Sequence, residues 1–512
     1  MISAQSGEVI LCDRCGSANV QGHGRRKGLQ RYHCMACGRV STDGQAARPQ
    51  LATEMTTAVP EGDVFVITWA QNATPVDPTT WALLHRYCEH TGAALMVIPG
   101  RYRNPTSQWT DANRGHEYWA DEVMPYITAG RLDIGPHCTA YGDIMVQPTA
   151  VTPLSGFERF AGEASAIFGH PKVQLSTIAS TDRMPRILAT TGACTVPNYT
   201  HSKSGKKGEV HHTLGAIVVE RSACGRFHLR HLTVAEDCIY DLTLRVGLDD
   251  VCDGYAPAAM VLGDLHVAKL EDEHRESTEL LLRELCPERL VLHDVLDFEA
   301  RNHHDTRDIF RNIRKAYGRG LLDSVENECR DAAMYLTHLA TLAASTYVVD
   351  SNHDRAFDRW LVEADPRKDP KNARFWAQMF AAKALASERG EEHNAFAGYC
   401  ETHHRITRIG VTFLKSEDRL TVLGYELSAH GDRGINGSRG TLLGYSKLGS
   451  RYIIGHSHTP GIRDGCMQVG VTARLDHGYN ARPSSWLNTH ALIYANGTAT
   501  LIHVISGQYR SS

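Results

Sequence analysis

The sequence predicts a mixed α/β fold built from more than one part, and three observations support that prediction. Short apolar segments of strand length alternate with longer helical patterns from residue 63 towards the C-terminus. Two closely spaced cysteine pairs near the N-terminus come before a polar segment that lacks apolar periodicity. In the second half of the chain, clusters of Asp, Asn and His directly follow the predicted strands.

The length and composition are those of an ordinary globular protein. The chain has 512 residues, with 42% hydrophobic and 22% charged residues and a net charge of −4. A chain of this length holds two or three domains at about 100–200 residues each. The net charge argues against a surface coated in basic residues, but a local basic patch is enough to bind phosphates.

The sequence lacks the patterns of secreted and membrane proteins. The N-terminal segment has no basic start followed by an apolar run, and no stretch approaches about 18 consecutive apolar residues. Four of the 14 cysteines are paired near the N-terminus and the other ten are scattered. This usage is typical of a reducing compartment, so we expect a cytoplasmic protein with no membrane partner.

The paired cysteines predict a structural zinc site. Each pair follows a C-x2-C pattern, which lets two thiolates reach one ion, and two pairs complete a closed tetrahedral site. A module this small buries little apolar surface, so bound zinc would supply much of its folding free energy. The four predicted ligands are Cys12, Cys15, Cys34 and Cys37.

A basic segment lies between the two cysteine pairs. Together with Cys15-Gly16-Ser17 and Arg31-Tyr32-His33-Cys34, it resembles the zinc ribbon at the front of many transposases, over about residues 9–40. The resemblance implies contact with DNA phosphates. The alternative is a structural or protein-docking ribbon with a solvated basic face, and the sequence leaves both open. The candidate DNA-binding residues are Arg25, Arg26, Lys27 and Arg31.

We divide the chain into a zinc ribbon at 1–45, a linker at 46–60, an α/β domain at 61–255 and a second α/β domain at 256–512. The linker is rich in small and polar residues and contains Pro. A predicted strand at 64–68, a helix at 81–91 and a strand at 94–98 imply a parallel α/β unit. Further strands are predicted at 173–178, 214–219 and 228–232. No catalytic pattern stands out in residues 60–250, so the role of this region stays open.

The C-terminal region again alternates strands and helices. Helices are predicted at 273–285, 323–343 and 375–388, and strands at 259–262, 290–292, 346–349, 420–426 and 452–454. Each strand runs into a polar cluster. Because ligands gather at the carboxyl ends of strands in open α/β sheets, five such clusters in order are hard to attribute to chance.

The residue types in these clusters suit a site for two divalent metals. Two such ions about 3.5–4 Å apart can clamp both the attacking and the leaving oxygen of a phosphodiester, and a carboxylate must bridge them. Mixed Asp, Asn and His ligands suit Mn, Fe or Zn with open positions, and they do not form a closed structural site. The candidate ligands are Asp264, His266, Asp294, Asn352, His430, His456 and His458.

The order of the clusters resembles that of calcineurin-like metallophosphoesterases, D-x-H, G-D, G-N-H-D/E, H and G-H-x-H, over about residues 257–505. The resemblance implies a β-sandwich flanked by helices. It implies that Asp264, His266 and His458 hold a first metal, that Asn352, His430 and His456 hold a second, and that Asp294 bridges them. His353 would act as general acid or stabilise the phosphate charge, and Asp354 would orient His353.

Two positions depart from the family pattern. His293 replaces the glycine before the bridging Asp, and Ser351 replaces the glycine before the Asn. Neither change removes a ligand. Asp297 is an alternative bridge, but Asp294 lies nearer to the end of its strand and is favoured for that reason.

Three features favour DNA as the substrate, although this fold also hosts phosphatases and cyclic-nucleotide phosphodiesterases. The ribbon resembles a DNA-binding appendage, and the arrangement resembles SbcD-type repair nucleases. A long insertion at about 301–345 is basic, with Arg301, Arg307, Arg311, Arg314, Lys315 and Arg319. A basic helical face is more often simply solvated.

Two further segments, at 67–76 and 97–107, resemble phage proteins related to those with which certain large siphophages degrade host DNA. This implies a phage-encoded, Mn-dependent DNase in the host cytoplasm, with Fe or Zn as alternative metals. We expect DNA as partner and a homo-oligomer. The alternatives are a phosphatase or phosphodiesterase acting on small molecules or phosphoproteins, and a non-catalytic DNA-binding protein.

Overall fold

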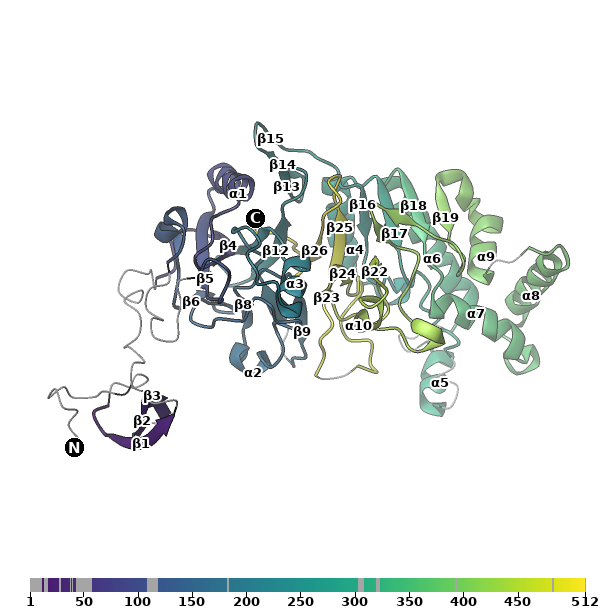
Figure 1. The fold of residues 1–512 in the computed structure, drawn as a ribbon. Coiled ribbons are helices and arrows are strands. Elements are labelled where there is room, and N and C mark those ends of the chain that lie inside the picture. Colours follow the sequence, from purple (N-terminus) through teal and green to yellow (C-terminus); the bar gives the residue numbers. More distant parts are fainter. Residues whose placement is uncertain are drawn as a thin grey trace.

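The computed structural model shows a mixed α/β fold with several sheets and helices, as predicted (Figure 1). The sheets have three, ten, four, three and six strands within the part of the chain that is described. The described residues are 12, 17–26, 29–36, 38, 40–42, 58–107, 118–181, 184–302, 308–318, 323–391, 394–480 and 483–511.

The N-terminal region forms a small antiparallel sheet in the order β1-β2-β3. Cys12 and Cys34 are buried, and Cys34 is the last residue of β2. The other two predicted zinc ligands, Cys15 and Cys37, lie outside the described residues, so the four-cysteine site stays a prediction. The strands are β1 (Val20–Arg26), β2 (Leu29–Cys34) and β3 (Val40–Thr42).

A four-stranded sheet contains the predicted parallel unit, which is confirmed. Strand β4 (Val64–Gln71) leads into helix α1 (Pro78–Thr91) and then into β5 (Ala94–Gly100), which pairs parallel with β4. Asp77 caps the start of α1 through the backbone N–H of Thr80. A hairpin of β11 (Gly215–Arg221) and β12 (Phe227–Thr233) completes the sheet.

A ten-stranded sheet joins residues from both sides of the expected division at 255/256. Strand β23 from the C-terminal region pairs antiparallel with β9 from the preceding region, through Gly461 with Ser176 and Ile462 with Leu175. The two regions are therefore linked by backbone hydrogen bonds. The strands are β6 (Arg131–Gly135), β7 (Cys138–Tyr141), β8 (Ser165–Phe168), β9 (Leu175–Ile178), β10 (Arg186–Thr190), β20 (Thr421–Val422), β21 (Tyr425–Glu426), β22 (Arg451–Ile454), β23 (Gly461–Arg463) and β24 (Cys466–Gln468).

A six-stranded sheet packs against the ten-stranded one. Val291 and Ile493 of the six-stranded sheet share one buried apolar cluster with Ile453 and Ile462 of the ten-stranded sheet, which is the layered packing of a β-sandwich. Strands β16 to β19 run parallel, and β25 and β26 close the sheet antiparallel. The strands are β16 (Ala259–Val261), β17 (Arg289–Leu292), β18 (Ser345–Val348), β19 (Val411–Phe413), β25 (Thr489–Ile493) and β26 (Ala499–His503).

Helices cover the other face of the six-stranded sheet. Leu281 of α4, Leu336 of α6 and Phe357 of α7 are buried in one cluster with Leu290 and Leu292 of β17. The predicted helices at 273–285, 323–343 and 375–388 correspond to α4, α6 and α8. The helices are α4 (Asp272–Leu285), α5 (Ile309–Ala316), α6 (Val325–Leu339), α7 (Asn352–Glu363), α8 (Ala373–Glu388) and α9 (Ala395–His404).

Shorter elements connect these layers. The third small sheet consists of β13 (Cys238–Asp241), β14 (Leu244–Gly247) and β15 (Val251–Cys252). The short helices are α2 (Glu158–Ala161), α3 (Lys203–Val210) and α10 (Leu442–Tyr445), with 3-10 turns at Asp121–Tyr126, Val267–Lys269, Ala340–Leu342, Pro366–Lys368, Ile406–Ile409 and Ile435–Gly437.

One predicted strand is wrong. Residues 420–426 were expected to form a single strand, but they form the hairpin of β20 and β21. Leu423 and Gly424 both have positive φ, at 47° and 83°, which is the backbone of a tight two-residue hairpin turn. The sequence does not indicate this turn, because the apolar pattern continues through it and leucine rarely adopts a positive φ.

Candidate metal centre

The predicted ligands come from the ends of strands in both layers of the sandwich. Asp264 and His266 follow β16, Asp294 follows β17, and Asn352 follows β18. These three strands are parallel neighbours, so their carboxyl ends lie along one edge of the six-stranded sheet. The remaining three ligands follow two parallel strands of the ten-stranded sheet: His430 comes after β21, and His456 and His458 come after β22.

The backbone at these strand ends is strained. His266, Asp294, His456 and His458 all have positive φ, between 43° and 72°, which costs free energy for residues with a Cβ and is concentrated at functional sites. Gly455 shows why one glycine is required here, because an added Cβ would lie 2.1 Å from Oδ1 of Asp264.

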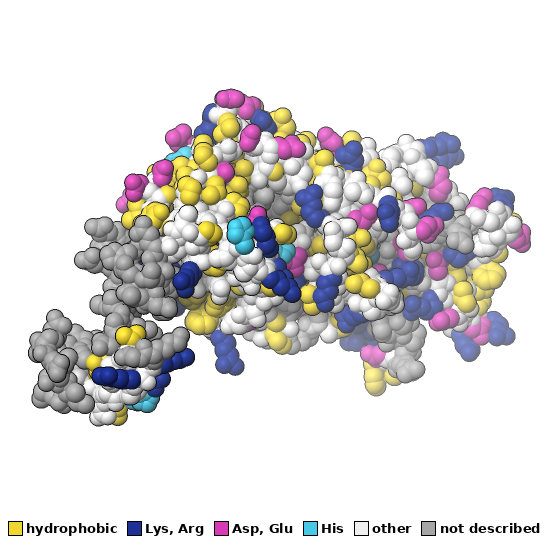
Figure 2. All heavy atoms as spheres, in the orientation of Figure 1, with side chains coloured by type: hydrophobic (Ala, Val, Ile, Leu, Met, Phe, Trp, Pro, Cys, Tyr) yellow, Lys and Arg dark blue, Asp and Glu magenta, His cyan; other side chains and the backbone are white. Residues whose placement is uncertain are grey.

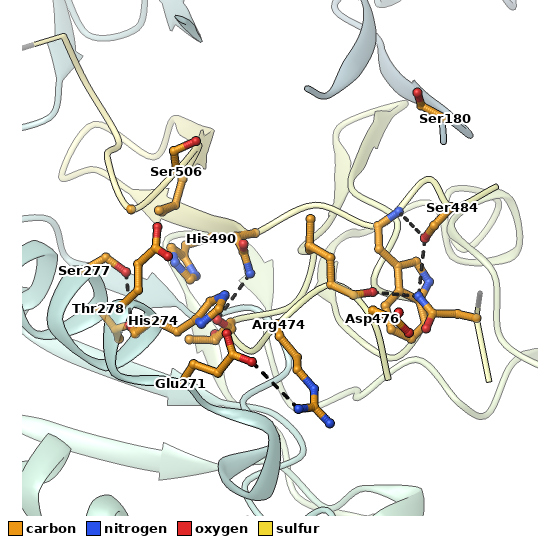
Figure 3. Close-up of a pocket in the computed structure, with 18 of the residues that line it drawn as sticks. Ser180, Glu271, His274, Ser277, Thr278, Arg474, Asp476, Ser484, His490 and Ser506 are labelled. Atoms are coloured by element: carbon orange, nitrogen blue, oxygen red, sulfur yellow. Dashed lines mark hydrogen bonds and ion pairs between the residues drawn. The ribbon is translucent and has the colours of Figure 1, made fainter. Parts of the chain in front are cut away.

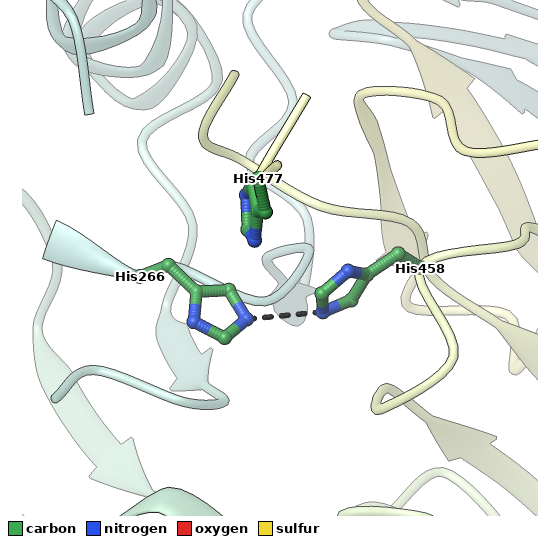
Figure 4. Close-up of side chains that lie close together, drawn as sticks. All are labelled: His266, His458 and His477. Carbon is green, nitrogen blue, oxygen red and sulfur yellow. Dashed lines mark hydrogen bonds between the residues drawn. The ribbon is translucent and has the colours of Figure 1, made fainter. Parts of the chain in front are cut away.

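The first predicted ligand set forms a compact group. One ligand atom from each of Asp264, His266, Asp294 and His458 lies within 4.8 Å of the others. Nε2 of His458 is 3.0 Å from Oδ2 of Asp264 and 3.0 Å from Nε2 of His266. Figure 4 shows the two imidazole rings pointing their nitrogens at one another.

The chemistry of this group fits a cation. Oδ1 of Asp264 and Oδ1 of Asp294 are buried and accept no hydrogen bond from the described residues. An unpaired carboxylate oxygen in the interior is costly, and facing imidazole nitrogens present lone pairs to the same space. A divalent ion held by these groups would satisfy all of them.

The second predicted set lies beside the first. Oδ1 of Asn352 is 3.1 Å from Nε2 of His430 and 3.1 Å from Nδ1 of His456. Oδ2 of Asp294 lies 3.2 Å from Nε2 of His430 and 3.6 Å from Nε2 of His266. Asp294 therefore stands between the two sets, at the place that a bridging carboxylate must occupy.

His293, which replaces the family glycine, packs into the wall of the centre. Its Nδ1 lies 3.4 Å from Nδ1 of His430, and its ring is fully buried. Burial and the neighbouring His430 lower the pKa of His293 to about 4, so the ring is neutral at neutral pH. Ser351, the other departure, caps helix α7 by accepting a hydrogen bond from the backbone N–H of Asp354.

Electrostatics keep the carboxylates of the centre ionised. Burial opposes ionisation of Asp294, but His430 and His353 outweigh it and hold its pKa well below the usual range. Burial likewise opposes ionisation of Asp264, and hydrogen bonding to His458 with the charge of His430 lowers its pKa. In turn, burial would lower the pKa of His430, but Asp294 raises it to about 9.

His353 is placed at the first turn of α7, facing the centre. Its Nδ1 donates to the carbonyl oxygen of Asp297 at 2.6 Å, and its Nε2 lies 4.0 Å from Oδ2 of Asp294. Burial lowers the pKa of His353, but Asp294 and Asp297 outweigh that effect and raise it. The Nε2 atom can therefore hold a proton beside the predicted ligands.

Asp354 is predicted to orient His353, and that role stays a prediction. In the structure its Oδ2 accepts hydrogen bonds from the backbone N–H and the hydroxyl of Ser351. This exchange with Ser351 forms a capping box that starts α7. The orienting contact comes from Asp297, whose carboxylate also lies 2.8 Å from Nδ1 of His266.

Several residues of the centre were not predicted from the sequence. His477, Tyr479 and Trp486 pack around the first ligand set, with the Trp486 ring 4.1 Å from that of His458. Lys269 lies 3.2 Å from the carboxylate of Asp297. An Asp-His-Gly-Tyr segment at 476–479 resembles no general pattern, so only its position in the fold identifies it.

A basic cleft of about 460 Å³ opens next to His477. Four cationic side chains line it, and Glu299 and Asp476 are the acidic ones. Figure 2 shows Lys and Arg gathered over the lower half of the visible face, with Asp and Glu more frequent along its upper edge. The cationic residues of the cleft are Lys269, Arg311, Arg314 and Arg474.

Only some of the basic residues of the predicted insertion line this cleft. Arg301 pairs with Asp323 and Asp369 at 2.9 and 2.6 Å, and Lys315 is buried. Arg307 and Arg319 lie outside the described residues. Among the predicted ribbon contacts, Arg25 and Arg26 are exposed on β1, Arg31 is half-buried on β2, and Lys27 lies outside the described residues.

A second cavity of about 810 Å³ lies beside the first (Figure 3). Arg474 lines both cavities, and its Nη1 lies 3.8 Å from Oε1 of Glu271. Ser180 and Ser484 close one end of this cavity by exchanging two backbone hydrogen bonds. The two regions of the chain therefore also meet here.

Comparison with known proteins gives one informative match. No family model matches the chain, and no solved structure matches it. The chain is 33% identical over 474 residues to the curated Protein A1 of Escherichia phage T5. The alignment covers 88% of this chain and 83% of that protein.

No helix among the described residues has both the length and the apolar character to cross a membrane.

Proposed function

The chain belongs to the family of Protein A1 of Escherichia phage T5, and from that premise we propose that it is a phage-encoded, metal-dependent DNA nuclease with a metallophosphoesterase fold. The observation that supports this most is the meeting of seven Asp, Asn and His side chains at one place, with Asp294 between two sets of ligands. Oδ1 of Asp264 and Oδ1 of Asp294 are buried and have no hydrogen-bond partner among the described residues. Bound cations would neutralise these two oxygens.

Asp264, His266 and His458 would hold one divalent metal, and Asn352, His430 and His456 the other, with Asp294 shared. Mn is the expected metal, and Fe or Zn also suit this mixture of oxygen and imidazole ligands. Bound there, the two metals would supply charge stabilisation at the phosphate and activation of water for its hydrolysis.

The chain's own contribution to bond cleavage comes from His353. Its Nδ1–H is committed to the carbonyl of Asp297, so the ring is fixed in orientation and Nε2 points at the predicted ligands. The neighbouring carboxylates favour its protonated form. His353 can therefore deliver a proton to the oxygen that leaves the phosphodiester.

The basic cleft favours a nucleic acid over a small phosphoester. Arg311, Arg314 and Arg474 extend cationic lining beyond His477, where only a substrate longer than one phosphate could use it. The N-terminal β1–β2 hairpin adds exposed Arg25 and Arg26. We place the activity in the host cytoplasm and propose that the protein acts as a homo-oligomer.

The test is cleavage of linear and circular DNA by the purified protein with Mn²⁺, alongside turnover of bis-p-nitrophenyl phosphate. We expect His353→Ala to lower both rates by about 10²–10⁴-fold, as for loss of a general acid, with metal content unchanged. His338→Ala, which removes a half-buried histidine on α6 that pairs with Glu279, is the matched control and should keep full activity.

The outcomes separate the alternatives. Turnover of the small diester with intact DNA would refute the nuclease and leave a phosphodiesterase. If His353→Ala cleaved both DNA and the small diester at the wild-type rates, the assigned role of His353 would be refuted. A protein that binds DNA without cleaving it or the diester would be a non-catalytic DNA-binding protein.

A further inference from the structure

His477 lies against the first ligand set but belongs to no part of the predicted pattern. Its ring centroid is 5.1 Å from that of His266 and 5.6 Å from that of His458. A ring nitrogen of each of the three residues lies within 4.8 Å of the others. Figure 4 shows His477 above the space between the two other rings.

The side chain of His477 is buried without a polar partner. It is 4% exposed, and neither Nδ1 nor Nε2 forms a hydrogen bond with the residues that the structure describes. Buried imidazole nitrogens nearly always have a partner. If His477 served only for packing, an apolar side chain of similar size in its place would make the fold more stable.

The turn that carries His477 fixes the ring in place. The backbone N–H of His477 donates to Oδ1 of Asn480 at 2.9 Å, and Nδ2 of Asn480 donates to the carbonyl of Leu475 at 2.7 Å. Trp486 packs across the ring with centroids 5.0 Å apart. The imidazole is thus held in one orientation before any ligand arrives, as a binding site requires.

We propose that His477 is an additional metal ligand, which joins His266 and His458 as a third imidazole on the first-metal side of the centre. This inference rests on the proposed metal-dependent function. The ring nitrogens of His477, His266 and His458 form a group that does not include the carboxylates of Asp264 and Asp294. His477 would therefore add a third nitrogen ligand to the site. Imidazole ligands suit Zn, Fe and Co, whereas Mg prefers oxygen. The third ring would therefore bias the site towards transition metals.

The test compares His477→Ala with the wild-type protein in metal binding, without reference to catalysis. Purified metal-free protein is titrated with Co²⁺ while its visible absorption spectrum is recorded, and with Mg²⁺ by calorimetry. We expect His477→Ala to weaken Co²⁺ binding at one site by at least about tenfold, to change the Co²⁺ spectrum, and to leave Mg²⁺ affinity nearly unchanged. Added imidazole should restore the spectrum by filling the vacated space.

His274→Ala is the matched control, because His274 is a half-buried histidine that lines the adjacent cavity instead of the centre. It should bind Co²⁺ as the wild type does. His477→Gln keeps a polar side chain of similar reach, and its near-ultraviolet circular dichroism checks that the fold is intact. It should show the same loss of Co²⁺ affinity without a change of fold.

An unchanged Co²⁺ spectrum and affinity in His477→Ala and His477→Gln would overturn the proposal. An equal loss of Co²⁺ and Mg²⁺ affinity would overturn it too, because a general collapse of the site would produce that result. If the wild-type protein bound no Co²⁺ or Mn²⁺ at all, the proposed function would fail together with this inference. If the wild-type protein binds Co²⁺ and the loss of His477 leaves that affinity unchanged, this inference alone is refuted.

Discussion

Asp297 contacts three residues of the candidate centre: His353, the predicted ligand His266 and Lys269. One carboxylate oxygen lies 2.8 Å from Nδ1 of His266, and the other lies 3.2 Å from Nζ of Lys269. Its backbone carbonyl accepts the hydrogen bond of His353. Burial would raise the pKa of Asp297, but its hydrogen bond with His266 and the charge of Lys269 lower it, so the residue is an anion at neutral pH. It orients both rings without itself standing between the two ligand sets.

We expect Asp297→Ala to reduce metal affinity by about 10–100-fold, which is the usual effect of removing a partner that orients a metal-bound histidine. Titration of the metal-free protein with Mn²⁺ measures this directly. Asp365→Ala, which removes a half-buried turn-capping carboxylate, serves as control. Unchanged Mn²⁺ affinity in Asp297→Ala would show that His266 needs no such support.

Helix α5 buries a lysine and exposes aromatic side chains, and the buried lysine holds the helix beside the centre. Lys315 is 2% exposed and its Nζ donates to the carbonyl of Glu299 at 2.6 Å, whereas Phe310 and Tyr317 are 74% and 77% exposed. The buried lysine anchors α5 over the loop that follows β17. Arg314 is left exposed at the basic cleft. A helix that presents aromatic and cationic side chains together suits contact with nucleic acid bases and phosphates.

Arg314→Glu should therefore weaken DNA binding without affecting the metal centre. Reversing one phosphate contact lowers affinity across all sequences and reduces the dependence of log Kd on log salt by about one. Fluorescence anisotropy with a labelled oligonucleotide at several salt concentrations measures both effects. Arg159→Glu on α2, which also carries an exposed Phe160, is the control. Equal loss in both variants would mean only that net charge had changed.

At the scale of the whole molecule, the preceding α/β region and the C-terminal region are built as one body. They share the ten-stranded sheet, and β12 of the four-stranded sheet packs on β26 of the six-stranded one. Figure 1 shows this continuity from β5 near one end of the body to α8 at the other. Buried histidines lie where the sheets meet: His228 and His231 on β12 and His503 on β26.

This junction should make the protein sensitive to acid. Burial lowers the pKa of His228 and His231 to about 4 and that of His503 to about 3, below the value of about 6.5 in the unfolded chain. A histidine with a lowered folded pKa contributes stability that is fully present above about pH 6.5. That stability is lost as the pH falls towards the folded pKa, by about 1.4 kcal/mol for each pKa unit of difference.

Thermal unfolding measured between pH 7 and pH 4 should show a Tm that falls steeply below about pH 6.5. His228→Leu removes one titrating ring and should flatten that fall while the Tm at pH 7 changes less. A Tm that stayed constant over this range would contradict the assignment of neutral histidines to the junction.

Much of the fold and of the centre follows from local sequence. The alternation of strands and helices, the parallel β4–α1–β5 unit and the side chains at the strand ends all depend on residues that are close in sequence. Strand ends are recognisable because the apolar pattern stops and the polar cluster starts within one or two residues. Asp264 and Asn352 are recognisable as candidate ligands for this reason.

The tertiary structure decided which of these residues meet and what supports them. His477 reaches His266, and β23 reaches β9, across long stretches of chain, and the pairing of strands sets both distances. The choice between Asp297 and Asp354 as partner of His353 likewise depended on where α7 begins relative to the loop after β17. Sequence spacing fixes contacts within a turn or a strand. Contacts between distant segments depend on how the sheets and helices pack, which no single pattern in this chain encodes.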